Sequence, residues 1–181
     1  MPTAKKKNPT WNDLKRAIGG LGRDALLTVL HDLYAASKDN RTFLHARFSL
    51  GDDVLAPYKA TISRWVCPDV MQAYSVAKAK KAISNYRKAI GHAEGMAELS
   101  VFYCESCRDL LGYCGMGDEV YFNALARMFE QALKLIVTCE PDQQKGFVAR
   151  LEDVRREGRH WGWGVGDDMD RLMAEYGFSK R

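Results

Sequence analysis

The sequence predicts an all-α protein with about eight or nine helices, packed as successive antiparallel hairpins in an orthogonal bundle or a short HEAT-like curved stack. Apolar residues recur at spacings of three and four, which is the period of a buried helix face. No segment alternates β-branched and polar residues as a strand does, and the connections are short enough to join antiparallel neighbours. The 181 residues suit one domain, which we place at residues 10–181.

The first two predicted helices cover residues 13–18 and 23–37. Thr10 or Asn12 can cap the first, and Gly19 and Gly20 end it, because glycine adopts turn conformations at little cost. The second has a wide apolar stripe, which we expect to be buried. The stripe contains Leu26, Leu27, Val29, Leu30, Leu33 and Tyr34.

Three further helices are predicted between residues 40 and 90. Asn40 starts a short one, and Asp52 or Asp53 caps the next, which runs to about residue 66. Ser75 caps the third, and its apolar residues form a seam that we expect to be buried. The seam contains Val76, Ala79, Ile83, Tyr86 and Ile90.

The last four predicted helices cover residues 96–113, 118–138 and 141–157, with a final one ending near residue 176. Gly91 and Gly95 are expected to bracket the loop before the first of them. Pro141 suits a first helical turn, where a missing N–H is least costly. Asp167 or Asp168 is the expected cap of the final helix.

Charge is distributed unevenly along the chain. Residues 1–92 contain 16 Lys and Arg against 7 Asp and Glu, a net charge of +9, whereas residues 93–181 contain 11 and 16, a net charge of −5. Such asymmetry favours contact with nucleic acid, head-to-tail self-association, or a partner with a matching electrostatic field. Charged side chains that only solvate helix faces explain it equally well. We expect a monomer, or weak self-association that salt loosens.

Residues 1–9, with Lys5, Lys6 and Lys7, are expected to form a flexible basic tail. No apolar run is long enough to span a membrane, so no membrane contact is expected. The five cysteines are odd in number and lie in apolar helical patterns rather than in a disulfide framework, which favours the cytoplasm.

Three segments resemble an uncharacterised bacterial family that is catalogued only as a domain of unknown function. They are Ser75 to Ser84, Tyr121 to Ile136, and Gly162 to Asp168. The resemblance would extend from Trp11 to Tyr176. It implies an all-helical fold and carries no catalytic residue to this chain.

No catalytic, cofactor-binding or metal site is predicted. His92-Ala93-Glu94 followed by Cys104 and Cys107 is similar to the ligand pattern of zinc deaminases. However, Cys104 follows Tyr103 rather than proline and lies inside a helical pattern, so these cysteines are expected to pack as small apolar side chains.

Two other features are candidate contact sites. The helix after Ser75 has a basic face opposite its seam, formed by Lys78, Lys81 and Lys88 with Arg87 at its edge, which could follow a phosphate backbone or remain a solvated face. The glycine-rich loop with Trp161 and Trp163 is either an exposed recognition loop or a plug that fills a gap between the last helices, and we favour the plug.

Abundant packing signals without catalytic residues favour a non-enzymatic helical interaction or adaptor protein. The expected partner is another protein. The alternative is a nucleic-acid-binding protein that uses the basic N-terminal half. An enzyme of unrecognised type is the third and least favoured reading.

Overall fold

The computed structural model describes residues 8–69, 71–114 and 118–178, which form nine helices and no strand. The prediction of an all-α fold is therefore confirmed. The expected basic tail at residues 1–9 lies outside the described residues except for Asn8 and Pro9. No helix within these ranges is long and apolar enough to cross a membrane.

The chain groups into two compact units, residues 1–44 and residues 45–181. We call them unit 1 and unit 2 and describe each by itself. Unit 1 contains α1 (Trp11–Ile18), α2 (Arg23–Ala36) and the first part of α3 (Lys38–Arg47).

The caps predicted in unit 1 are partly confirmed. Thr10 caps α1 through a capping box with Asp13, whose carboxylate accepts the backbone N–H of Thr10 at 2.8 Å. The helix predicted from Asn40 begins two residues earlier, because the hydroxyl of Ser37 accepts the N–H of Asn40.

The prediction of a buried stripe on residues 23–37 is wrong. None of the described residues 8–44 is buried, and α2 has no buried residue. Helical periodicity identifies the apolar face of a helix but not a neighbour that covers it. A unit of this size has too few residues to enclose such a face.

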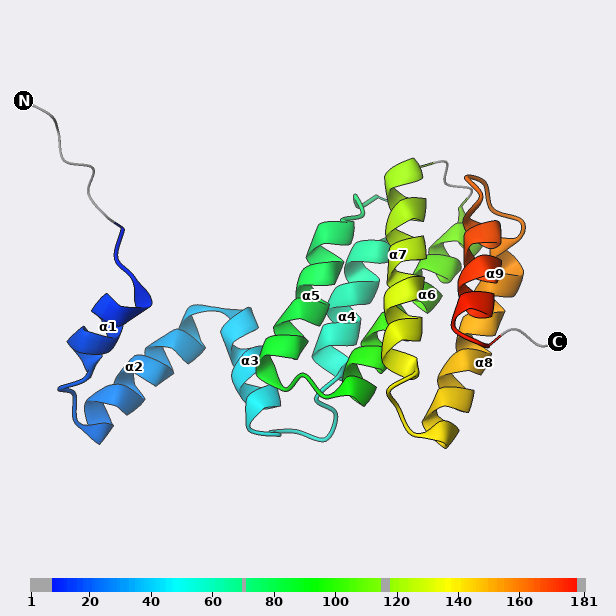
Figure 1. Cartoon of the computed structure of the whole chain (residues 1–181). Helices are drawn as coiled ribbons and strands as arrows, with labels where there is room; N and C mark the ends of the chain where they lie inside the picture. The colour runs from blue at the N-terminus through cyan, green and yellow to red at the C-terminus, as the bar shows by residue number, and fades with distance from the viewer. Residues whose placement is uncertain (1–7, 70, 115–117, 179–181) are drawn as a thin grey trace, which may run out of the picture. The chain divides into compact units, whose positions relative to one another are not determined.

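Unit 2 is a stack of three helix pairs (Figure 1). The α6–α7 pair lies between the α4–α5 pair and the α8–α9 pair, because α6 contacts α4, α5 and α8 while α7 contacts α8 and α9. This arrangement agrees with the predicted succession of helix hairpins. The helices are α4 (Ala56–Val66), α5 (Val76–Ala89), α6 (Ala93–Tyr113), α7 (Glu119–Ile136), α8 (Pro141–Gly158) and α9 (Val165–Glu175).

Several helix boundaries differ from the sequence prediction, and two of them involve glycine residues. Gly95 lies inside α6 rather than in a loop, and a Cβ at this position would lie 2.0 Å from the hydroxyl oxygen of Tyr86. Gly95 therefore allows α5 and α6 to approach each other closely. The last helix begins at Val165 after Gly164, whose φ is +66°, so neither Asp167 nor Asp168 caps it.

The core of unit 2 lies along α6 and α7. Tyr103 and Tyr121 are among its largest fully buried side chains, together with Phe129. Tyr121 donates a hydrogen bond to the carbonyl of Val66, which joins the start of α7 to the end of α4.

Candidate functional site

The helix α5 has one buried side and one cationic side. Its N-cap, Ser75, accepts the backbone N–H of Lys78 at 3.4 Å, as its position before the helix predicts. The predicted seam packs inward through Ala79, Ile83 and Tyr86. The helix has five cationic residues and no acidic one, the cations being Lys78, Lys80, Lys81, Arg87 and Lys88.

The four residues predicted as a contact site are all exposed. Lys81 and Lys88 are seven residues apart and lie in the middle of the solvent side, whereas Lys78 and Arg87 lie at its two edges. We call these four residues the basic face. The structure thus brings all of them to the accessible side of one helix.

Trp65 on α4 adds an aromatic group to this face. The Nζ atom of Lys78 lies 3.8 Å from the centroid of the Trp65 ring, and the guanidinium of Arg64 lies 5.4 Å from the same centroid. Both separations are in the range of cation–π interactions. Sequence reasoning missed Trp65 and Arg64, because they lie on a different helix from Lys78 and only the packing of α4 against α5 brings the three side chains together.

Lys80 belongs to the interior edge of α5 rather than to the basic face. Its side chain is half-buried, and burial lowers the pKa of its ammonium group, as does the positive charge of Arg127 on α7. The like charges of Lys80 and Arg127 raise the positive potential along this side of unit 2.

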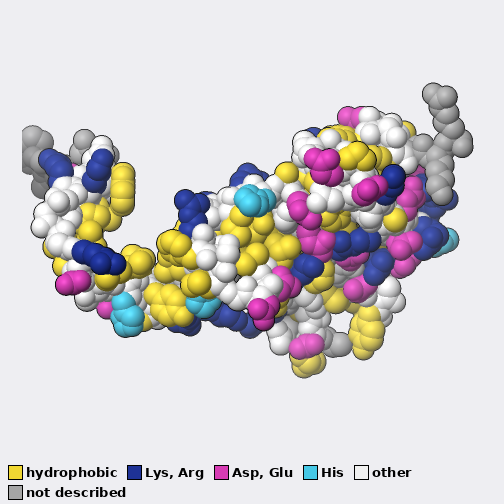
Figure 2. All heavy atoms as spheres, turned by 90° about the horizontal axis from the view of Figure 1, so that it is seen from below, with side chains coloured by type: hydrophobic (Ala, Val, Ile, Leu, Met, Phe, Trp, Pro, Cys, Tyr) yellow, Lys and Arg dark blue, Asp and Glu magenta, His cyan; other side chains and the backbone are white. Residues whose placement is uncertain are grey.

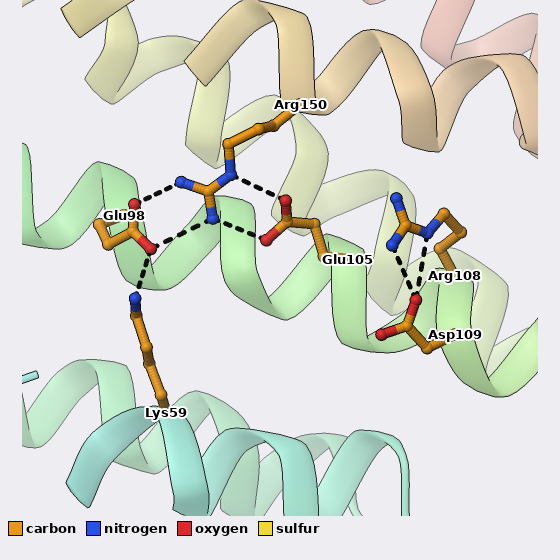
Figure 3. A network of polar contacts seen from close by, with 6 residues as sticks. All are labelled: Lys59, Glu98, Glu105, Arg108, Asp109 and Arg150. Carbon is orange, nitrogen blue, oxygen red and sulfur yellow. Dashed lines mark hydrogen bonds and ion pairs between the residues drawn. The ribbon is translucent and has the colours of Figure 1, made fainter. Parts of the chain in front are cut away.

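The other cations of unit 2 are mostly paired with carboxylates, and Figure 3 shows the largest of these groups. The guanidinium of Arg150 on α8 bridges Glu98 and Glu105 on α6, with nitrogen–oxygen distances from 2.5 to 3.1 Å. The Nζ atom of Lys59 on α4 lies 2.6 Å from Glu98. This group joins three helices and is a structural tie.

The charges of this tie stabilise one another. Burial acts to raise the pKa of Glu98, but hydrogen bonds from Arg150 and Lys59 outweigh it and hold the pKa below its usual value. Hydrogen bonds to Glu105 and Glu98 raise the pKa of Arg150 against the opposing effect of burial. By contrast, Lys78, Lys80, Arg87 and Lys88 of α5 make no ion pair with any carboxylate in the described ranges.

The two tryptophans of the glycine-rich loop have different environments. The ring of Trp161 is half-buried, within 3.5 Å of the position that a Cβ on Gly158 would occupy. Trp163 is 60% exposed, with φ at +63°. Trp161 therefore packs against α8, whereas Trp163 is exposed, and a recognition role for this loop stays a prediction.

The cysteines show no sign of a metal centre. Cys104 and Cys107 are buried, and burial raises the pKa of Cys107 to about 12. No group of three or more His, Cys, Asp or Glu residues that could hold a metal ion occurs in the part of the chain that the structure describes.

An open hollow of about 290 Å³ lies between α7 and α9. Its charged lining residues largely neutralise one another, since Arg171 pairs with Asp168 at 3.2 Å and with Glu175 at 3.4 Å. This leaves the basic face as the strongest candidate site of unit 2.

No protein-family model, curated protein or solved structure matches the chain.

Proposed function

We propose that this chain is a non-enzymatic helical interaction protein that binds an acidic segment of a partner protein through the basic face. The observation that carries the proposal is the contrast in pairing within unit 2. Most cations elsewhere in the unit are paired with carboxylates, with Arg47, Arg64 and Arg127 as the exceptions among the described residues. Three of the four cations of the basic face, Lys78, Arg87 and Lys88, have no carboxylate partner there. Exposed like charges repel one another and lower their mutual repulsion by binding an anionic surface.

Trp65 and Arg64 favour a protein partner. Trp and Arg are enriched at protein interfaces, where they combine a large contact area with fixed hydrogen-bonding or stacking geometry. The stack of helix pairs supports these side chains on regular secondary structure, so little backbone ordering would be needed on binding.

Nucleic acid is the second candidate partner. Lys81 and Lys88 lie about 10 Å apart along the helix axis, at about 1.5 Å per residue, so both could contact phosphates of one backbone. Such contacts would position a nucleic acid without reading its sequence.

The test compares two double variants of the full chain. Lys81→Glu with Lys88→Glu reverses the centre of the basic face. Lys145→Glu with Arg156→Glu makes the same charge change at two exposed cationic residues of α8. Each protein is used to capture partners from a lysate of the source cells, with and without nuclease, and is titrated with a labelled oligoglutamate peptide and a generic DNA duplex.

A protein partner that survives nuclease, together with oligoglutamate binding that only the basic-face variant loses, would support the proposal. Binding confined to DNA, weakening with salt and lost in the same variant, would select the second candidate. Equal behaviour of the two variants with every probe would overturn both.

A further inference from the structure

At the start of α5 the basic face borders the ring of Trp65. Trp65 is half-buried in the last turn of α4, and its carbonyl oxygen accepts the backbone N–H of Ser75 at 2.7 Å. This hydrogen bond joins the end of α4 to the N-cap of α5. The backbone at Trp65 is therefore held in place beside the first turn of α5, and the ring belongs to the same surface as Lys78.

Two cations without carboxylate partners converge on this ring. The Nζ atom of Lys78 lies 3.8 Å from the ring centroid, and the guanidinium of Arg64 lies 5.4 Å from it. Neither cation pairs with a carboxylate in the described parts of the chain. A ring face holds a cation more weakly than a carboxylate does, so both cations keep the capacity to bind an anion.

The surface changes character beyond Arg64. Arg64 also lines an open hollow of about 280 Å³ at the end of α4, so this hollow is adjacent to the Trp65 ring. Its walls include the half-buried Cys67 and Pro68 and the exposed Asp69. The charge of Asp69 disfavours a further carboxylate in the hollow, whereas the apolar atoms of Pro68 and of the ring favour an apolar side chain.

Apolar side chains are also accessible in unit 1, as Figure 2 shows for α1 and α2. Their surroundings do not specify the charge of what would cover them, because residues 8–44 contain five Lys and Arg against four Asp. Trp65 differs, since the cations beside it favour an anionic partner.

Given an acidic partner segment, as the proposed function requires, we propose that Trp65 selects segments in which an apolar side chain stands at one end of a run of carboxylates. The carboxylates bind the cations along α5, and the apolar side chain covers the Trp65 ring beside the hollow. Lys78 and Lys88 lie about 15 Å apart along the helix axis, at about 1.5 Å per residue. An extended segment of about five residues spans this length, at about 3.3 Å per residue.

The test is fluorescence anisotropy of labelled peptides titrated with the full chain at about 0.1 M salt. One peptide is oligoglutamate, and in the others phenylalanine replaces a single glutamate, at each position in turn. We expect phenylalanine near one end to tighten binding about tenfold, because it buries apolar surface against the ring. Phenylalanine in the middle should give no gain, since it removes a carboxylate from the cations of α5.

Three variants assign the gain to the ring. Trp65→Ala should abolish it and leave the Kd for oligoglutamate within about threefold, because only the cation–π contacts change. Trp65→Phe should retain most of the gain, since it keeps an aromatic ring. The matched control, Trp163→Ala, removes a tryptophan that is 60% exposed on another loop and should change neither value.

The outcomes separate the role of Trp65 from the proposed function. Oligoglutamate binding that is lost in the Lys81→Glu, Lys88→Glu variant, but that phenylalanine tightens at no position, would overturn the role of Trp65 alone. A gain that Trp65→Ala retains would do the same. Failure of every peptide to bind would overturn both.

Two further measurements complete the test. Tighter binding of a single-stranded oligonucleotide than of any peptide, lost in Trp65→Ala, would overturn the proposal, because the ring would then be a platform for stacked bases. Circular dichroism shows whether each variant is folded. If Trp65→Ala is not folded, the peptide series with wild type and Trp65→Phe still decides, since a wild type without any gain contradicts the proposal.

Discussion

The Arg150 tie offers a quantitative test of how unit 2 is held together. Replacing Arg150 with Met keeps much of the apolar stem but removes four hydrogen bonds to Glu98 and Glu105. These carboxylates are only 16% and 19% exposed in their side chains, so both would remain largely desolvated. Lys59 would still neutralise part of the charge on Glu98.

Breaking a fully buried ion pair costs about 3–5 kcal/mol. Arg150 is 33% exposed, so we expect a smaller loss of about 2–3 kcal/mol in the free energy of unfolding. Urea unfolding at pH 7, followed by tryptophan fluorescence, measures this loss. The control is Arg156→Met, which removes an exposed pair with Asp153 and should cost less than about 0.5 kcal/mol.

The pH dependence gives an independent check. The pKa of Glu98 is depressed in the folded protein, so its contribution to stability is present above its unfolded pKa and is lost as pH falls through the folded value. Without Arg150, burial should raise this pKa. The difference in stability between wild type and Arg150→Met should therefore shrink as pH falls from the raised pKa of Glu98 in the variant, above 4.5, to its depressed pKa in wild type, below 4.5. Equal losses in the Arg150 and Arg156 variants, or a difference that does not change with pH, would refute the reasoning.

Three further predictions concern the core of unit 2 and are tested by the same unfolding measurements or by thiol labelling. Tyr121→Phe removes the hydrogen bond to the end of α4 and should lower the free energy of unfolding by about 1–2 kcal/mol. Tyr103→Phe removes a buried hydroxyl that has no hydrogen-bond partner and should be neutral or stabilising. Similar losses of stability in the two variants would contradict this prediction. Gly95→Ala places a methyl group against the Tyr86 hydroxyl and should cost about 1–3 kcal/mol, so an unchanged Tm would show that the two helices separate easily. Burial raises the pKa of the Cys107 thiol to about 12, so this thiol should remain protonated below that pH and react with a thiol reagent only as the protein unfolds. Rapid labelling of Cys107 in the folded protein at pH 8 would contradict its assignment to the core.

Sequence reasoning predicted local features well where one segment contains the whole signal. The cap at Ser75 and the seam of α5 depend on residues close together in the chain. The cap is confirmed, and the seam is buried at Ala79, Ile83 and Tyr86 but only half-buried at its ends, Val76 and Ile90. The stripe from Leu26 to Leu33 was assigned to the right helix but wrongly expected to be buried, because burial depends on what lies opposite. The partners of Arg150 were not predicted, since Glu98 is 52 residues away and only the packing of α6 against α8 brings them together.

The central position of α6 determines how unit 2 can open. Because α6 packs against α4, α5, α7 and α8, its backbone amides can exchange with solvent only when several helix contacts are lost together. The amides of α2, which has no buried residue, lack such protection within unit 1. Native-state hydrogen exchange of the α6 amides would therefore report global unfolding of unit 2. Exchange of the α2 amides would report whether another surface covers its apolar stripe.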